Sequence, residues 1–243
     1  MRCKSHVYLI EKRSSMITLL FDVDGTLADT ERDGHRVAYN RAFKEAGLDW
    51  VWSIPLYGEL LQVTGGKERM RFYVEKYRTD WVVGAELDQL IANLYAIKTG
   101  FFGELVRSGA IPLRPGVEKL LRDAKAAGLR LGIATTTSPH NVRALLESNL
   151  GEEAWGWFAC IGAGDIVPRK KPAPDIYLYV MEQLGVTPQE CLAFEDSGVG
   201  VQAARGAGLP VVVTFTEYTC NDDFTGAKLV LDQLDLELVK QLF

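Results

Sequence analysis

The sequence has few cysteines, few histidines and no long apolar run, and each shortage excludes a class of protein. The four cysteines are scattered without close pairing over 243 residues, which argues against a disulfide-stapled scaffold. The three histidines lack the spacing of a zinc site. No apolar run approaches the roughly 20 residues that cross a bilayer. We therefore expect reduced cysteines and no membrane partner.

Positive charge is also scarce. The chain has 27 Lys and Arg against 32 Asp and Glu, a formal net charge of −5. Such a chain offers no broad positive field for nucleic acid, so we expect no nucleic-acid partner. An anionic substrate must be held by a few local cations, by helix N-termini or by a metal ion. Hydrophobic residues make up 47% of the chain, enough for a substantial core. We also expect the protein to be a monomer.

Residues 1–15 are polar and mixed in charge, without the apolar stretch of a secretory signal. We expect them to be a disordered extension, or to be wrongly assigned to the chain, with translation starting at Met16.

From residue 16 onward, short apolar segments alternate with helical patterns, except between residues 31 and 111, where no strand pattern occurs. The predicted strands are 16–20, 129–134, 157–161, 190–194 and 209–214, with 228–231 as a further candidate. Alternation of this kind is typical of a parallel sheet in an α/β protein. We predict a Rossmann-like core with helices on both faces, formed by 16–30 and 112–243, and a small helical domain inserted at 31–111.

Polar side chains gather where several predicted strands end. Asp22 and Asp24 follow the first strand, Thr135 to Ser138 follow the second, and Glu195 and Asp196 follow a later one. The carboxyl ends of parallel strands lie at one edge of a sheet, so we expect these groups to share a crevice. Carboxylates packed this closely need a cation, and such an oxygen-rich set suits Mg²⁺.

Two other interpretations of the first carboxylate pair stay open on local grounds. Asp-Gly is ordinary turn chemistry. A calcium loop of the helix–loop–helix kind needs its glycine at the sixth position, whereas Gly25 is fourth counting from Asp22.

Lys171 supplies a candidate cation for the crevice. It lies between Arg169 and Asp175, where two prolines stiffen the approach to a predicted helix. A lysine about 4 Å from a phosphate oxygen contributes on the order of 4 kcal/mol at an effective dielectric near 20. The alternative is a solvated basic run.

Four motifs, in order along the chain, resemble those of the haloacid dehalogenase-like hydrolases. They are Asp22-Val23-Asp24-Gly25-Thr26, which matches the DxDGT signature, then Thr135, Lys171-Pro172 and Glu195-Asp196-Ser197. The helical insert stands where that superfamily has a small cap domain. Flanking segments resemble more narrowly the CbbY-type xylulose-1,5-bisphosphate phosphatases, at 64–69, 134–138, 170–177 and 217–219.

The resemblance implies roles for the core motifs. Asp22 would be the nucleophile that forms an aspartyl-phosphate, and Asp24 the general acid and then base. Asp22, Asp24 through its carbonyl, and Asp196 would hold Mg²⁺, supported by Glu195. The phosphoryl group would be bound by Thr135 and Lys171.

The helical insert is expected to choose the substrate. Gly65, Gly66 and Lys67 at a helix start make an anion site, and Arg69 could add a bidentate contact. A second anion site away from the metal suits a substrate with two phosphates. By resemblance Glu31, Tyr57 and Asn141 line a sugar pocket, and Thr136 and Thr137 join the substrate-binding set.

We therefore expect an Mg²⁺-dependent phosphatase acting on a small sugar phosphate, with xylulose-1,5-bisphosphate the candidate that the resemblance favours. The alternatives are a phosphosugar mutase of the β-phosphoglucomutase kind, a phosphatase for another sugar phosphate, or a binding module without catalytic activity. We expect a cytoplasmic protein, or one of the chloroplast stroma if the source is a eukaryotic phototroph.

Overall fold

The computed structural model describes residues 17–63, 65–78 and 84–234. The expected extension at 1–15 and the last residues of the predicted core lie outside these ranges. In the described part of the chain, no helix is both long and apolar enough to cross a membrane.

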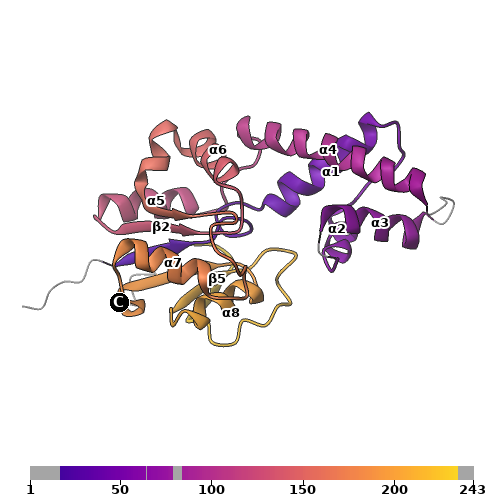
Figure 1. The fold of residues 1–243 in the computed structure, drawn as a ribbon. Coiled ribbons are helices and arrows are strands. Elements are labelled where there is room, and N and C mark those ends of the chain that lie inside the picture. The colour runs from indigo at the N-terminus through magenta and orange to yellow at the C-terminus, as the bar shows by residue number, and fades with distance from the viewer. Residues whose placement is uncertain (1–16, 64, 79–83, 235–243) are drawn as a thin grey trace, which may run out of the picture.

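A six-stranded parallel sheet forms the centre of the larger part of the molecule (Figure 1). Its spatial order is β3-β2-β1-β4-β5-β6, and every neighbouring pair is parallel. The strands are β1 (Thr18–Phe21), β2 (Arg130–Ala134), β3 (Phe158–Gly162), β4 (Cys191–Glu195), β5 (Val211–Thr214) and β6 (Leu229–Leu231). Because β1 is central, the residues that follow it face the middle of the sheet's carboxyl edge.

Helices cover both faces of the sheet. Successive side chains of β1 point to opposite faces, so this strand contributes to the hydrophobic core on each side. Leu19 and Phe21 pack with α5 (Val117–Ala126) and α6 (Pro139–Leu150) on one face. Leu20 packs with α7 (Asp175–Leu184) and α8 (Gly198–Gly206) on the other. Two 3₁₀ turns, η2 (Glu152–Trp157) and η3 (Pro188–Glu190), precede β3 and β4. The predicted fold class is confirmed.

The segment between β1 and α5 is helical and carries its own aromatic core. Its helices are α1 (Arg36–Glu45), α2 (Ile54–Leu60), α3 (Gly66–Tyr77) and α4 (Ala85–Arg107). Its buried rings include Tyr39, Phe43, Trp52, Tyr57 and Tyr73. We call this helical unit the cap. In Figure 1, α2 and α3 lie below α1 and α4. The Tyr57 ring on α2 is 5.8 Å from that of Tyr218, which follows β5.

Two details differ from the sequence expectation. The helical insert expected at 31–111 begins with a π-helix, η1 (Thr30–His35), before α1. Gly34 lies within it, so tightly packed that a Cβ would be 2.7 Å from Ile111 and 2.8 Å from Phe102. The predicted strand at 190–194 is shifted by one residue, so Glu195 is the last residue of β4 rather than the first of a loop.

Candidate active site

Asp22 and Asp24 leave the carboxyl end of β1 beside β4. The Asp22 N–H donates to the Phe194 carbonyl at 3.0 Å, which extends the β1–β4 ladder to the carboxylate itself. Gly25 then turns the chain with φ +84°, and its N–H donates to the Ala28 carbonyl at 2.7 Å. The ladder and the tight turn fix the direction of both carboxylates.

Lys171 joins two carboxylates across the sheet edge. Its Nζ donates to Asp22 Oδ1 and to Glu195 Oε1, each at 2.6 Å. Burial alone would lower the pKa of Lys171, but the charges of Asp22 and Glu195 outweigh it and raise this pKa above its ordinary value. Tyr177 on α7 donates its hydroxyl to the same Glu195 oxygen at 2.5 Å. Lys171 is therefore a fixed ammonium ion in the crevice.

Asp24 is held by two hydroxyls rather than by a cation. Thr30 donates to Asp24 Oδ1 at 2.7 Å, and Thr137 donates to Oδ2. Burial, followed by the charge of Asp22, raises the pKa of Asp24 to about 7. A carboxyl group with such a pKa can carry a proton or release it near neutrality, as general acid–base catalysis requires.

Three carboxylates converge in the way that a divalent cation needs. One oxygen from each of Asp22, Glu195 and Asp196 lies within 4.8 Å of the other two. Burial, together with the charges of Asp22 and Glu195, raises the pKa of Asp196. Within the described residues the Asp196 carboxylate accepts no hydrogen bond, although Asp196 is only 7% exposed. The donor set of hard oxygens and its excess of negative charge over Lys171 fit Mg²⁺.

Two glycines let these carboxylates approach the backbone closely. A Cβ on Gly25 would lie 2.1 Å from Asp196 Oδ2, and one on Gly200, in α8, would lie 1.8 Å from Glu195 Oε2. Any side chain at either position would push a carboxylate out of the cluster.

A cleft of about 290 Å³ opens over these groups. Its lining residues are Asp22, Asp24, Thr136, Lys170, Lys171, Glu195, Asp196, Ser197 and Val199. The cleft thus gathers most of the predicted core residues.

Three further predicted residues lie outside the lining of this cleft. Thr135 is 1% exposed, and its hydroxyl accepts from the Thr137 N–H at 3.3 Å. The Thr137 hydroxyl is engaged with Asp24. Asn141 lies in the first turn of α6, where its N–H donates to the capping Ser138 hydroxyl.

In the cap, the structure joins Glu31, Tyr57 and Arg69, three residues that the sequence grouped. Tyr57 donates to Glu31 Oε2 at 2.6 Å, and Arg69 Nη1 donates to the Tyr57 hydroxyl at 2.8 Å. Arg69 Nη1 is also 3.9 Å from Glu31 Oε2. The Glu31 charge contributes to the raised pKa of Asp24, so this trio is close enough to act on the cleft electrostatically.

Gly65, Gly66 and Lys67 lie at the start of α3. Among the described residues, no side chain caps that helix end. Lys67 Nζ lies 5.5 Å from the Tyr95 ring centroid, and a Cβ on Gly66 would lie 2.4 Å from the Tyr39 hydroxyl. None of the three lines the cleft.

Lys98 and His35 were missed by the sequence reasoning. Lys98 Nζ and His35 Nδ1 are 2.8 Å apart, and Lys98 is only 7% exposed. Burial lowers the pKa of His35 to about 4 and that of Lys98 to about 8. The signal was present in the sequence, because Lys98 interrupts the buried stripe of α4 formed by Ile91, Leu94, Phe102 and Leu105.

Tyr177 and Thr30 were also missed as site residues. Tyr177 shares its helix face with Ile176 and Val180 and looks like a core residue. Thr30 follows the motif without any periodic signal. Only the tertiary structure shows that their hydroxyls hold Glu195 and Asp24.

Residues 17–208 match the haloacid dehalogenase-like hydrolase family. The chain belongs to this family. Among its curated relatives is the plasmid-encoded CbbY protein of Cupriavidus necator, 50% identical over 90% of this chain and 86% of the relative. The CBBY-like protein of Arabidopsis thaliana is 43% identical over 88% of this chain and 68% of the relative.

The chain is also similar to a solved structure of mutant CbbY from Rhodobacter sphaeroides in complex with xylulose-(1,5)bisphosphate. The two share 44% identity over 90% of this chain and 94% of that one, with a TM-score of 0.73. A putative β-phosphoglucomutase from Thermotoga maritima has the same TM-score at 27% identity, over 94% of this chain and all of that one. Within the haloacid dehalogenase-like hydrolases this protein is therefore a CbbY-type enzyme, a phosphatase of sugar phosphates.

Proposed function

We propose that the protein is an Mg²⁺-dependent phosphatase that converts xylulose-1,5-bisphosphate to xylulose 5-phosphate through an aspartyl-phosphate on Asp22. The observation that carries this proposal is the buried cluster at the carboxyl edge of the sheet. The cluster combines the fixed ammonium ion of Lys171 with three converging carboxylates. One positive charge does not neutralise three carboxylates, so the cluster keeps an excess of negative charge. The similar CbbY of Rhodobacter sphaeroides in complex with the bisphosphate supports the choice of substrate.

Asp22 is the proposed nucleophile. One of its oxygens, Oδ1, is held by Lys171 at 2.6 Å, so the carboxylate lies in the cleft in a fixed orientation. Attack on phosphorus forms the Asp22–phosphoryl bond as the bond to the sugar oxygen breaks. Lys171 lies beside the same carboxylate, where its charge stabilises the negative charge that spreads over the phosphoryl oxygens.

Asp24 is the proposed acid and base. In the first step it gives a proton to the leaving sugar oxygen. In the second it takes a proton from the water that attacks the aspartyl-phosphate, which releases inorganic phosphate and restores Asp22. The hydroxyls of Thr30 and Thr137 keep the Asp24 carboxyl aimed while its protonation changes.

Asp22, Asp196 and the Asp24 carbonyl would hold the Mg²⁺, with Glu195 in support. When bound, the ion supplies charge neutralisation and orientation for the phosphoryl oxygens. The Asp196 carboxylate, buried and without a hydrogen-bond donor among the described residues, is the group whose charge most needs such an ion.

The cap is proposed to recognise the second phosphate and the sugar. Arg69 is a buried guanidinium. The start of α3, which no described side chain caps, adds backbone N–H groups beside Lys67. Glu31 and Tyr57 are hydrogen-bonded to each other and next to Arg69. They can exchange these bonds for sugar hydroxyls.

A phosphosugar mutase is the second candidate, because the putative β-phosphoglucomutase of Thermotoga maritima matches the chain at 27% identity over its whole length. A mutase would return the phosphoryl group from Asp22 to a sugar instead of to water. Interconversion of glucose phosphates without net phosphate release would support that candidate.

The test is phosphate release from a panel of sugar mono- and bisphosphates, with Mg²⁺ and with EDTA. We expect fastest turnover of xylulose-1,5-bisphosphate, dependence on Mg²⁺, and loss of turnover in Asp22→Asn. Activity retained in that variant would disprove the aspartyl-phosphate route. A preference for a monophosphate would disprove the substrate while leaving the chemistry intact.

A further inference from the structure

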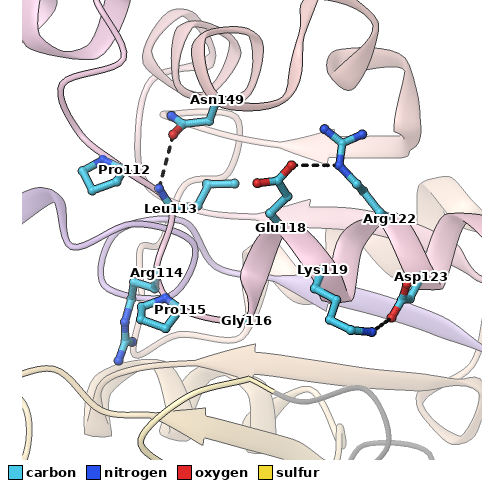
Figure 2. A pocket seen from close by; sticks show the side chains of 10 residues that line it. All are labelled: Pro112, Leu113, Arg114, Pro115, Gly116, Glu118, Lys119, Arg122, Asp123 and Asn149. Carbon is cyan, nitrogen blue, oxygen red and sulfur yellow. Dashed lines mark hydrogen bonds and ion pairs between the residues drawn. The ribbon is translucent and has the colours of Figure 1, made fainter.

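Arg114 stands out among the residues that line a cavity of about 620 Å³ beside α5 (Figure 2). The other charged side chains drawn there form pairs along the helix, Glu118 with Arg122 and Lys119 with Asp123. The guanidinium of Arg114 points away from these pairs, out of the cavity. Its partners are backbone carbonyls that lie outside this cavity.

Arg114 binds three backbone carbonyls, one in the loop after β1 and two where β5 ends and its loop begins. Nη1 donates to the carbonyl oxygens of Gly25 and Thr214, and Nη2 donates to that of Phe215 at 2.6 Å. The Arg114 N–H also donates to the Leu27 carbonyl at 2.8 Å. One residue therefore fastens the loop after β1 to the loop after β5.

Of these contacts, the one to Gly25 bears on the cation site. Gly25 directly follows Asp24, and its Cα faces the Asp196 carboxylate so closely that a Cβ would lie 2.1 Å from Oδ2. The position of the Gly25 peptide thus decides how far the Asp24 carbonyl and Asp196 stand from each other. The charge of Asp196 also partly offsets the lowering of the Arg114 pKa by burial, so the two groups interact electrostatically.

We propose that Arg114 is a positioning residue for the divalent cation: by holding the Gly25 carbonyl it keeps the loop after β1 against Asp196. This inference rests on the proposed Mg²⁺ dependence. Arg114 does not touch the ion or the substrate. It acts through the backbone, as residues behind metal ligands commonly do, and their replacement typically weakens metal binding by about 10- to 100-fold.

A purely structural role makes a different prediction. If Arg114 only ties the segment between α4 and α5 to the core, its replacement lowers the free energy of unfolding but leaves Mg²⁺ affinity unchanged. Metal affinity, measured on folded protein, therefore separates the two roles where activity alone would not.

The experiment is a calorimetric titration of Mg²⁺ into the metal-free full chain, with thermal unfolding in EDTA recorded for every variant. We expect Arg114→Met to weaken binding by about tenfold or more. Arg114→Lys keeps the charge but cannot bridge three carbonyls with a planar fork, so it should also bind more weakly than the wild type. Arg122→Met is the matched control. It removes the same charge from the same cavity wall and should bind Mg²⁺ as the wild type does.

Each outcome decides the matter. Wild-type affinity in Arg114→Met, or in Arg114→Lys should the first variant fail to fold, overturns the inference and leaves the proposed function standing. Equal weakening in Arg122→Met also overturns it, because the effect would then be one of net charge. Failure of the wild-type protein to bind Mg²⁺ overturns the proposed metal dependence itself.

Discussion

Replacement of Lys171 by methionine removes the cation that lies between two buried carboxylates. The Lys171 side chain is 9% exposed, and those of Asp22 and Glu195 are 10% and 1% exposed. Methionine keeps the length and the apolar stem of the lysine, so the change isolates the charge. We expect Lys171→Met to lower both the free energy of unfolding in EDTA and kcat/KM.

The magnitude follows from the two contacts. Unit charges 2.6 Å apart attract by about 6 kcal/mol at an effective dielectric near 20, and Lys171 makes two such contacts. The cost of taking the three groups out of water offsets most of this attraction. Removal of one partner from a buried pair typically costs about 3–5 kcal/mol, against a total stability of about 5–15 kcal/mol. The loss of one preorganised electrostatic group should reduce kcat by about 10²- to 10³-fold.

Urea denaturation in EDTA, with phosphate release measured in Mg²⁺, tests both effects on the same samples. Mg²⁺ should bind the variant more tightly than the wild type, because Asp22 and Glu195 have lost their cation. Saturating Mg²⁺ should then restore part of the stability, but not the activity. Lys171→Arg, which keeps the charge, is the control and should lose less stability.

Two results would refute this reasoning. Unchanged stability of Lys171→Met in EDTA would mean that the ion pairs contribute nothing net beyond their desolvation cost. Unchanged kcat/KM would mean that Lys171 does not neutralise the transferring phosphoryl group, and the role proposed for it would be wrong.

Three further predictions concern single groups. The His35 pKa is about 4 against about 6.5 when unfolded, so only the unfolded state takes up this proton as the pH falls from about 6.5 to 4. This uptake lowers the free energy of unfolding of the wild type by about 2–3 kcal/mol across the window. His35→Gln, which can still accept a hydrogen bond from Lys98, should abolish this loss, as measured by urea denaturation at several pH values. Tyr177→Phe should cost about 1.5–3 kcal/mol in the same assay, because Glu195 loses a buried donor; a neutral change would show that the bond adds nothing. Thr18→Val should raise stability by about 1 kcal/mol, because the buried Thr18 hydroxyl has no hydrogen-bond partner among the residues that the structure describes, and any loss would contradict this.

The sequence predicted which groups meet at the sheet edge but not how they pair. The rule for parallel strands was enough to bring Asp22 together with Glu195 and Asp196. Lys171, 149 residues from Asp22, follows no predicted strand end and was only a candidate cation for this crevice. The sequence assigned Lys171 to the phosphoryl group and Thr137 to the substrate. The structure engages Lys171 with Asp22 and Glu195, and Thr137 with Asp24. Such pairings depend on side-chain directions that no periodicity encodes.

The start of the cap shows a second limit. The insert was predicted to be helical from residue 31, but the chain forms a π-helix there before α1. Gly34 in this π-helix packs beside Ile111 and Phe102, which come from the far end of the cap segment, so closely that a Cβ would lie 2.7 Å and 2.8 Å from them. Helix propensity at the start of the insert carries no information about that contact. In contrast, Lys98 could have been found from the sequence, because a charge inside an apolar stripe is visible without the structure.

The pairing of charges in the cap bears on why a bisphosphate should be preferred. Arg69 lies against Glu31 and Tyr57, so an incoming anion gains from Arg69 only by replacing Glu31. A phosphate with two charges attracts a guanidinium about twice as strongly as a carboxylate does at the same distance, which makes the exchange favourable. A monophosphate whose only phosphate occupies the cleft brings no charge to the cap, and Arg69 stays with Glu31. Arg69→Met should therefore raise KM for xylulose-1,5-bisphosphate far more than KM for a monophosphate. An equal rise for both substrates would disprove that Arg69 binds the second phosphate.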